Sequence, residues 1–286
     1  MPHYLSSHAG YVLHERAEQY YGEGTGFLSI KSFFHGQALY SVGRGQYAAN
    51  DRSYLVLNHG QPYTISIESD RPVESFCLFF APGFAEAVHY SLTTAADRIV
   101  LEPQAGSSSP LTFFERTYPH DAVLSPALFQ LRSAFARYEP EPSWLIEQFH
   151  GIMQRLLQVH TRIYKEVDAL PAVRAATREE LYRRLHYARD YAAALFATPI
   201  TLNDMAEVAA LSPNHLLRMF KQLFHQTPYQ YITSKRLEHA QYLLARTEQS
   251  VTEICFAVGF ESLGAFSWLF RRRIGVSPSA YRQQSR

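Results

Sequence analysis

The chain has 286 residues, of which 47% are hydrophobic and 19% charged, and its formal net charge at pH 7 is +1. At about 100–200 residues per domain this length predicts two domains, and the composition is that of a globular protein, neither disordered nor fibrous. No apolar run approaches the ~18–20 residues of a membrane span, and the start of the sequence does not read as a signal peptide. The two cysteines, Cys77 and Cys255, are far apart, which excludes a disulfide framework, and we expect a cytoplasmic protein with reduced thiols.

The first part of the chain predicts an antiparallel β-sandwich or barrel, with strands over about 26–118. Segments rich in β-branched and aromatic residues recur roughly every 10 residues, a spacing typical of all-β domains. Turn-forming residues separate them at 43–45, 58–62 and 70–72. The expected strands are 26–34, 38–42, 53–58, 63–69 and 74–80, with one more at 113–118.

The pattern then changes to helices, which we expect over about 126–167. After Ser143, a suitable N-cap, apolar residues recur at the alternating spacings of a heptad seam. Two interpretations are open: an amphipathic helix packed on its own strands, or a helix that joins two copies of the chain. The residues of this predicted dimer helix are Leu145, Phe149, Ile152, Leu156, Val159 and Ile163.

A break around Pro171 predicts a linker over 169–177 between a domain over 1–168 and a domain over 178–286. The charge divides near the same point. Residues 1–172 carry 12 Lys and Arg against 17 Asp and Glu, whereas residues 173–286 carry 15 against 9. A basic half joined to an acidic half indicates that the C-terminal half meets a polyanion, the alternative being chance segregation of surface charge.

The C-terminal half, which reads as all-helical, contains a duplication over 201–232 and 250–282. Each copy predicts a short helix, a tight turn and a second helix, which is the helix-turn-helix geometry. The shift between copies grows from 49 to 50, so the second copy has one extra residue between its two helices. The matched pairs are Leu202 and Val251, Met205 and Ile254, Ala209 and Val258, Leu211 and Phe260, Phe220 and Phe270, Pro228 and Pro278, and Tyr231 and Tyr281.

The residues at the two turns fit this geometry. Ser212 and Ser262 offer N-cap oxygens for the second helix of each copy, and Gly259 allows a positive φ. The small residues Ala206 and Cys255 fall where the two helices of each copy would cross.

Between the copies, one amphipathic helix is predicted over 228–246. Its 19 residues would span ~28 Å at 1.5 Å per residue, close to the ~34 Å between successive major grooves on one face of DNA. Such a rod can hold two recognition helices in successive grooves. Its apolar positions are Tyr231, Ile232, Leu237, Ala240, Leu243 and Leu244.

At these residues the sequence resembles the AraC/XylS family of bacterial transcription regulators, over roughly 178–286. The N-terminal strands are similar to the cupin-like effector domain that many such regulators carry. The resemblance implies an α+β chain: a cupin-like β-sandwich or barrel followed by helices, then an all-α domain with two helix-turn-helix motifs joined by a central helix. It is carried by Thr201, Leu202 and Ala206; Ser212, Pro213, Leu216, Arg218, Met219, Phe220 and Lys221; Pro228, Tyr231, Ile232, Arg236 and Leu237; Ile254, Val258, Gly259 and Phe260; Phe266, Ser267 and Phe270; and Gly275, Val276, Ser277, Pro278, Tyr281 and Arg282.

Carried over by position, the resemblance predicts the DNA contacts. Basic residues late in the recognition helices reach phosphates, and earlier residues reach base edges. A run such as Arg271–Arg273 elsewhere would be a solvated surface. The predicted base-reading residues are Asn214, Leu217, Arg218, Leu263, Gly264, Ala265 and Trp268. The predicted phosphate contacts are Ser212, His215, Lys221, Ser262, Arg271, Arg272 and Arg273.

The second recognition helix departs from the family pattern. Trp268 stands where a basic residue is common, and Gly264 and Ala265 replace larger and often polar residues. Because Arg218 can bind guanine with two hydrogen bonds while Ala265 offers only apolar contact, we expect the first motif to carry most base discrimination. The alternative for Trp268 is core packing against the central helix.

The N-terminal half contains nine of the thirteen histidines but no His-x-His followed by Glu, the pattern that a cupin metal site resembles. It also lacks a Gly-rich phosphate loop and a nucleophile elbow. We therefore expect no enzyme, no metal and no cofactor. Two alternatives stay open: a metal-dependent cupin enzyme fused to a DNA-binding domain, and a regulator whose N-terminal domain only dimerises.

The leading hypothesis is a sequence-specific transcription regulator controlled by a small-molecule effector in the N-terminal domain. Aromatic side chains of the strands could line the pocket, since ligand pockets are mostly apolar. The candidate effector contacts are Arg44, Tyr47 and Tyr63. The expected partners are double-stranded DNA, the effector, a second copy of the chain and, for an activator, RNA polymerase; no membrane is expected.

Overall fold

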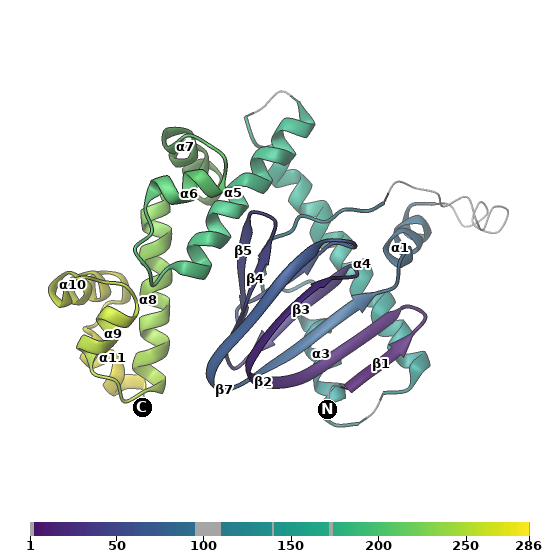
Figure 1. Cartoon of the computed structure of the whole chain (residues 1–286), viewed down its shortest axis with the longest axis horizontal. Helices are drawn as coiled ribbons and strands as arrows, with labels where there is room; N and C mark the ends of the chain where they lie inside the picture. The colour runs from purple at the N-terminus through teal and green to yellow at the C-terminus, as the bar shows by residue number, and fades with distance from the viewer. Residues whose placement is uncertain (1–2, 95–109, 139, 172–173, 286) are drawn as a thin grey trace. The chain divides into compact units, whose positions relative to one another are not determined.

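The structure, a computed structural model, describes residues 3–94, 110–138, 140–171 and 174–285 (Figure 1). The chain divides into two compact units, residues 1–183 and 184–286. The first contains a β-sheet and helices, and the second contains helices and no strand among its described residues 184–285. No helix within the described parts of the chain combines the length and apolar character needed to cross a membrane.

Within its described residues, the first unit is built on one antiparallel sheet of eight strands. In spatial order it runs β1-β2-β7-β3-β6-β5-β4, with β8 beside β6. Because β4 also pairs with β7, the strands β7, β3, β6, β5 and β4 close into a five-stranded barrel, from which β2 and β1 extend. The strands are β1 His3–Ser7, β2 Gly10–Thr25, β3 Ser29–Phe34, β4 Gln37–Val42, β5 Gly45–Asn50, β6 Ser53–Leu57, β7 Pro62–Phe80 and β8 Thr117–Pro119.

Strand β7 closes the barrel because it is long enough to pair twice along one edge. Its first half pairs with β4 through residues 64–66, and its second half pairs with β3 through residues 74–79. Along the other edge β2 follows it with a register shift between Ala17 and Gln19. The turn predicted at 70–72 is therefore an irregularity within one strand, where Pro72 is tolerated because regular pairing is interrupted.

The two faces of β3 have different surroundings. Successive side chains alternate between faces, and all six residues of β3 are buried. Phe34 contacts Phe129 of a covering helix, so its face is the outer one. Ser29, Lys31 and Phe33 lie on the opposite face, which is the interior of the barrel.

Helices cover the outer face of the sheet. The described ones are α1 Phe84–Thr93, α3 Ser125–Phe135 and α4 Pro142–Asp168, and α4 packs on the sheet through a contact between Phe149 and Phe80. Of the six residues predicted to form a dimer seam, five are buried in the chain's own core and Val159 is partly buried. The seam is therefore an internal packing face, and its use for dimerisation was the wrong interpretation. The buried five are Leu145, Phe149, Ile152, Leu156 and Ile163.

The sequence interpretation missed the start of the sheet and one helix. Strands begin at His3 and not near residue 26, and α1 lies inside the region expected to be β-structure. The sequence did not predict β2 because its second half is mostly exposed and mixes charged and aromatic residues. It therefore lacks the alternation of apolar and polar residues that indicates a strand. Of the expected linker 169–177, residues 172–173 lie outside the described residues, and α5 Ala175–Leu195 already begins within it.

The second unit repeats a three-helix pattern. The first copy contains α6 Leu202–Val208, α7 Pro213–Phe224 and the central helix α8 Pro228–Arg246. The second contains α9 Val251–Ala257, α10 Leu263–Ile274 and α11 Pro278–Ser285. The starts of corresponding helices are 49, 50 and 50 residues apart, as the sequence duplication predicts. Figure 1 shows α6 with α7 toward one end of α8 and the second copy toward the other.

Candidate nucleic-acid interface and ligand pocket

The first helix of each copy begins at the same hydrogen-bonded cap. Thr201 and Asp204 form a reciprocal capping box at α6, and Ser250 and Glu253 form one at α9. In each box the cap hydroxyl accepts a bond from a backbone N–H and the acidic side chain accepts one from the N–H of the cap residue. These bonds hold the pKa of both carboxyl groups below their ordinary values.

The turn inside each motif is also duplicated. Leu211 N donates to Ala206 O at 2.9 Å, and Phe260 N donates to Cys255 O at 3.1 Å. The residue before each donor is left-handed: Ala210 has φ 49° and Gly259 has φ 89°. This bond pattern ends a helix and reverses the chain, so both motifs turn by the same route although only the second has glycine.

Each recognition helix then starts at a serine. Ser212 Oγ accepts a bond from His215 N at 3.4 Å, and Ser262 Oγ accepts one from Ala265 N at 3.4 Å. The extra residue of the second copy is Glu261, which lies exposed between turn and cap. The predicted N-caps are confirmed, and both hydroxyls serve the helix itself.

One face of each recognition helix, α7 and α10, packs against the core of the second unit. Leu216, Met219 and Phe220 of α7 are buried, and so are Phe266 and Phe270 of α10. In α10 these two phenylalanines join a core with Leu237, Ala240 and Leu244 of α8 and with Ile254, Cys255 and Val258 of α9. This packing fixes which residues remain outside.

The predicted base-reading residues all lie on the outer face. Leu217 is 38% exposed, Leu263 39% and Trp268 57%, and the others are exposed as well. Trp268 is therefore not packed against the central helix. The Arg272 guanidinium lies 5.0 Å from the centroid of the Trp268 ring. The other exposed members are Asn214, Arg218, Gly264 and Ala265.

The predicted phosphate-contacting cations lie at the ends of the same helices. Lys221 is in the last turn of α7, and Arg271, Arg272 and Arg273 are in the last turn of α10. All four side chains are exposed, whereas His215 is only partly exposed. Cations there also interact favourably with the helix dipole.

Contacts around residues 196–198 join the two copies into one body. Arg236 of α8 donates to Phe196 O at 2.7 Å and to Thr198 O at 3.0 Å. A Cβ on Gly259 would lie 2.6 Å from Ala197 O. Glycine is therefore required in the second turn both for its φ and for this close approach.

The first unit separates the three candidate effector contacts. Arg44 is exposed in the turn between β4 and β5. Tyr47 is buried and pairs in register with Tyr40, whose ring lies 5.6 Å from that of Tyr63. The structure thus groups Tyr47 and Tyr63 around Tyr40 on the barrel wall and leaves Arg44 outside.

Sequence reasoning missed Lys31, a buried cation inside the barrel. The side chain is 2% exposed, and its ammonium lies 3.6 Å from the ring centroid of Phe79. Burial lowers the pKa of Lys31 to about 8. The signal in the sequence was that Lys31 lies between Ile30 and Ser32 in a predicted strand. Side chains alternate between the two faces of a strand, so when both faces are buried one of them must face the barrel interior.

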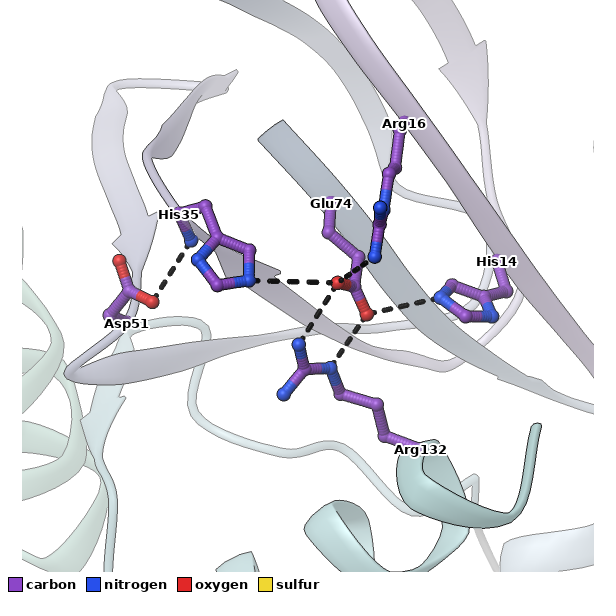
Figure 2. Close-up of polar contacts among 6 residues, drawn as sticks. All are labelled: His14, Arg16, His35, Asp51, Glu74 and Arg132. Carbon is purple, nitrogen blue, oxygen red and sulfur yellow. Dashed lines mark hydrogen bonds and ion pairs between the residues drawn. The ribbon is translucent and has the colours of Figure 1, made fainter. Parts of the chain in front are cut away.

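A second missed group is the Glu74 cluster on the outer face, shown in Figure 2. Glu74 is 2% exposed and accepts two bonds from Arg132 at 2.6 and 2.9 Å. His14 Nε2 lies 3.0 Å from one carboxylate oxygen, and Arg16 donates to the other at 3.2 Å. His35 lies 3.9 Å away. These bonds join β2, β7 and α3 and hold the pKa of Glu74 at about 2.

No group of three His, Cys, Asp or Glu side chains that could hold a metal ion occurs among the residues that the structure describes. Two histidines of the first unit make other contacts: His35 lies at the Glu74 cluster, and the His120 ring is hydrogen-bonded to Ser125 Oγ.

Comparisons with known proteins agree with this geometry. A family described as a helix-turn-helix domain matches residues 205–284. The transcriptional activator RhaR of Klebsiella pneumoniae is 27% identical over 85% of this chain and 83% of its own length. The melibiose operon regulatory protein of Escherichia coli is 36% identical over 30% of this chain and 28% of its own length. The C-terminal domain of AraT, a response regulator of Geobacillus stearothermophilus, is 35% identical over 36% of this chain and 87% of that domain, with a TM-score of 0.35.

A duplicated helix-turn-helix unit with exposed recognition faces, preceded by a β-barrel unit, defines a DNA-binding regulator of transcription. Residues 205–284 are a helix-turn-helix domain of the AraC type, as the sequence resemblance indicated, and the chain is similar to transcription regulators that carry this domain.

Proposed function

We propose that each chain reads two successive major-groove segments of its target DNA, one with α7 and one with α10, and that a small molecule bound in the barrel controls this binding. The repeated caps and turns support the proposal that the chain reads two groove segments, because they present seven predicted base-reading residues on exposed helix faces. The domains implied are 1–168 for the effector, a linker over 169–177 and 178–286 for DNA.

The two recognition helices have different roles in this proposal. Asn214 and Arg218 of α7 offer hydrogen-bonding groups for base edges. The outer face of α10 offers apolar contact through Leu263, Ala265 and Trp268, next to three arginines. We infer that α7 supplies most of the sequence discrimination and α10 most of the backbone attraction.

The test begins by selecting bound sequences from random DNA with the full-length protein. On the recovered site, Arg218→Ala should cost about 1–3 kcal/mol and relax preference at one base pair. Arg272→Ala should weaken binding to specific and random DNA alike and reduce the salt slope by about 1. Arg137→Ala, an exposed arginine of the first unit, is the matched control. Indistinguishable effects of the first two changes on specific and random DNA would refute the division of roles.

Control by a small molecule rests on a barrel interior lined by aromatic side chains, as ligand sites are, and on the effector domains typical of the family. A ligand that binds one arrangement of the protein better than another shifts the population toward it. A bound metabolite should raise the apparent melting temperature and change operator affinity. Equal affinity and equal transcription with and without saturating ligand would reject effector control.

We further propose a non-enzymatic protein that acts at bacterial chromosomal DNA in the cytoplasm, as a homodimer, and that contacts RNA polymerase if it activates. Because the α4 seam is buried, a dimer must use another surface. Sedimentation at several protein concentrations tests the dimer. Stoichiometric metal in the purified protein together with a metal-dependent activity would instead favour a cupin enzyme.

A further inference from the structure

The second half of β2 has an open edge. β1 pairs only with Gly10–His14 of β2, and no described strand pairs with residues 15–25 on that side. On the other side, the stretch Gln19–Thr25 pairs with β7 without a register shift. This regular stretch extends for about 24 Å at ~3.4 Å per residue. Its backbone N–H and C=O groups on the open side can therefore pair with a further strand.

Several features that natural proteins use to block such an edge are missing from this stretch. Proline, lysine, a bulge or a covering helix usually prevents a strand edge from pairing with another chain. Residues 19–25 contain no proline and no lysine, and their pairing with β7 is regular. Tyr20 is 47% exposed and Tyr21 67%, so no described part of the chain covers them. A long and exposed edge is typical of β-augmentation, in which an extended peptide adds a strand to a sheet.

The charge of this region indicates the chemistry of the partner. Residues 17–25 and 62–70 contain no lysine, arginine or histidine. Their four carboxylates are exposed, and none forms an ion pair within the described residues. They are Glu18, Glu23, Glu68 and Asp70. A second copy of the chain would bring another acidic edge against the first, and like charges on adjacent strands are destabilising. The complementary partner is therefore basic.

One face of the two strands is acidic beside the open edge. Gln19 lies opposite Glu68 in the register with β7. Because side chains alternate between the faces of a strand, Tyr21 and Glu23 share this face with Glu68. Tyr21 donates a hydrogen bond to Glu23 at 2.5 Å, and a groove of about 660 Å³ has Tyr21, Glu68 and Asp70 in its lining. Basic side chains of an added strand would meet carboxylates here, and a cation over the Tyr21 ring is attracted by its π-system.

The opposite face carries tyrosine rings and no charge over residues 20–24. Tyr20 lies opposite the buried Ile67, and a Cβ on Gly22 would lie 2.7 Å from the Tyr20 hydroxyl. Tyr63 covers Gly24 in a similar way, with 3.4 Å between its hydroxyl and the position of a Cβ. The two glycines thus let aromatic rings lie across the strand. Apolar side chains of an added strand would pack on this surface.

We propose that the open edge of β2 binds an extended segment of a partner protein in which basic and apolar residues alternate. The segment adds a strand to the sheet, with its basic residues over Glu23 and Glu68 and its apolar residues over Tyr20. Backbone hydrogen bonds along β2 supply affinity, and the two faces select the alternation. The edge includes neither recognition helix and needs no effector, so the inference goes beyond the proposed reading and control of DNA.

The test uses the full-length protein and a labelled nine-residue peptide of alternating lysine and valine, with binding followed by fluorescence anisotropy at fixed salt. One matched peptide is N-methylated along its backbone, which keeps the charges but removes the ladder hydrogen bonds. Another has glutamate in place of lysine. The lysine peptide should bind, and each matched peptide should bind at least tenfold more weakly.

Variants of the protein test the two faces separately. Glu23→Gln combined with Glu68→Gln should weaken the lysine peptide at least fivefold, and Tyr20→Ala should weaken it at least threefold. Glu141→Gln combined with Glu147→Gln removes the same charge from exposed positions in or beside α4 and should leave the affinity unchanged. The variants should select the same DNA sites as the wild-type protein, so failure of either proposal leaves the other standing.

Three results would overturn the inference: no binding of the lysine peptide, equal binding of the N-methylated or glutamate peptide, or full affinity in the Glu23 and Glu68 double variant. A protein that ignores the lysine peptide and forms dimers that dissociate in Tyr20→Ala would assign the edge to a second copy. Sedimentation of the wild-type and Tyr20→Ala proteins at several concentrations identifies that outcome.

Discussion

Glu74 shows how one buried carboxylate can hold several elements together. Its oxygens accept bonds from Arg132 of α3 and contact His14 and Arg16 of β2, and the Arg132 guanidinium also lies 3.7 Å from the ring centroid of Phe34. Removing one member of a buried ion pair leaves the other charge uncompensated, which costs more than the pair contributes.

We therefore expect Glu74→Gln to lower the free energy of unfolding by about 3–5 kcal/mol, measured by urea denaturation at pH 7. Glu68→Gln, an exposed change in the same strand, should alter it by less than about 0.5 kcal/mol. A Glu74 variant as stable as the Glu68 variant would show that the cluster contributes nothing.

The acid stability of the protein should depend on the same carboxylate. The Arg132 hydrogen bonds lower the pKa of Glu74 from 4.5 to about 2. A group whose pKa is lower in the folded state stabilises the folded protein fully at pH values above its pKa in the unfolded state. This contribution is lost as the pH falls through the pKa of the folded state. The free energy of unfolding of the wild-type protein should therefore fall by about 3 kcal/mol between pH 5 and pH 2 because of Glu74, and Glu74→Gln should not show this loss. Parallel curves for the two proteins over this range would contradict it.

How far residues could be predicted from sequence depends on how local their environment is. Ser212 and Ser262 were recognised as caps because a cap is defined by its own neighbours. Lys31 was missed because its burial depends on the closure of the barrel by residues 64–66 with β4, a pairing across more than twenty residues. Glu74 was missed for the same reason, since Arg132 comes from a distant helix.

At the scale of elements, the turns of the two motifs use different residues in the same backbone conformation. Ala210 at φ 49° and His225 at φ 57° occupy the left-handed positions that Gly259 and Gly275 occupy in the second copy. A side chain disfavours this conformation by roughly 1–2 kcal/mol. The first copy therefore contains two strained turn residues that the second does not.

Ala210→Gly should accordingly raise the free energy of unfolding by about 1 kcal/mol, measured by thermal denaturation. Gly259→Ala should lower it by about 2–3 kcal/mol, because its Cβ would also approach Ala197 O to 2.6 Å. Exchange of Ala209, buried before the turn in a right-handed conformation, to Gly is the control and should only destabilise. An Ala210→Gly protein less stable than wild type would contradict the turn assignment.

The heptad seam of α4 shows why periodicity did not identify the partner of a helix. Spacings of 3 and 4 place apolar residues on one stripe whether that stripe meets another copy or its own sheet. In the structure Phe149 contacts Phe80 of β7, so the stripe is core.

Phe149→Ala should cost about 3–5 kcal/mol of folding stability while leaving the sedimentation coefficient at micromolar concentration unchanged. Ile152→Val, at about 0.5–1.5 kcal/mol, provides a milder test, and the exposed Gln158→Ala is the control. A Phe149 variant that dissociates into stable monomers would restore the dimer interpretation.

At the scale of the whole molecule, the duplication of the helix-turn-helix motif was predicted from sequence, because helix lengths, caps and the one-residue shift are all local properties. The N-terminal unit was predicted only as a class of fold, since its barrel closes through long-range pairs and its first strands carry no alternating pattern.

The final prediction concerns the spacing of the DNA segments that one chain reads. The central helix α8, 19 residues long, spans ~28 Å, so the two contacts should be centred about 10–10.5 base pairs apart on one face. Inserting 5 base pairs between the two halves of the selected site turns one half to the opposite face, and inserting 10 restores the face but exceeds the reach of α8. Both insertions should reduce affinity to that of a single half-site, measured by fluorescence anisotropy at fixed salt. Mutating either half alone should have the same effect as the insertions, and base changes between the halves are the control. Full affinity at both insertions would mean that a flexible connection, or only one motif, reads the DNA.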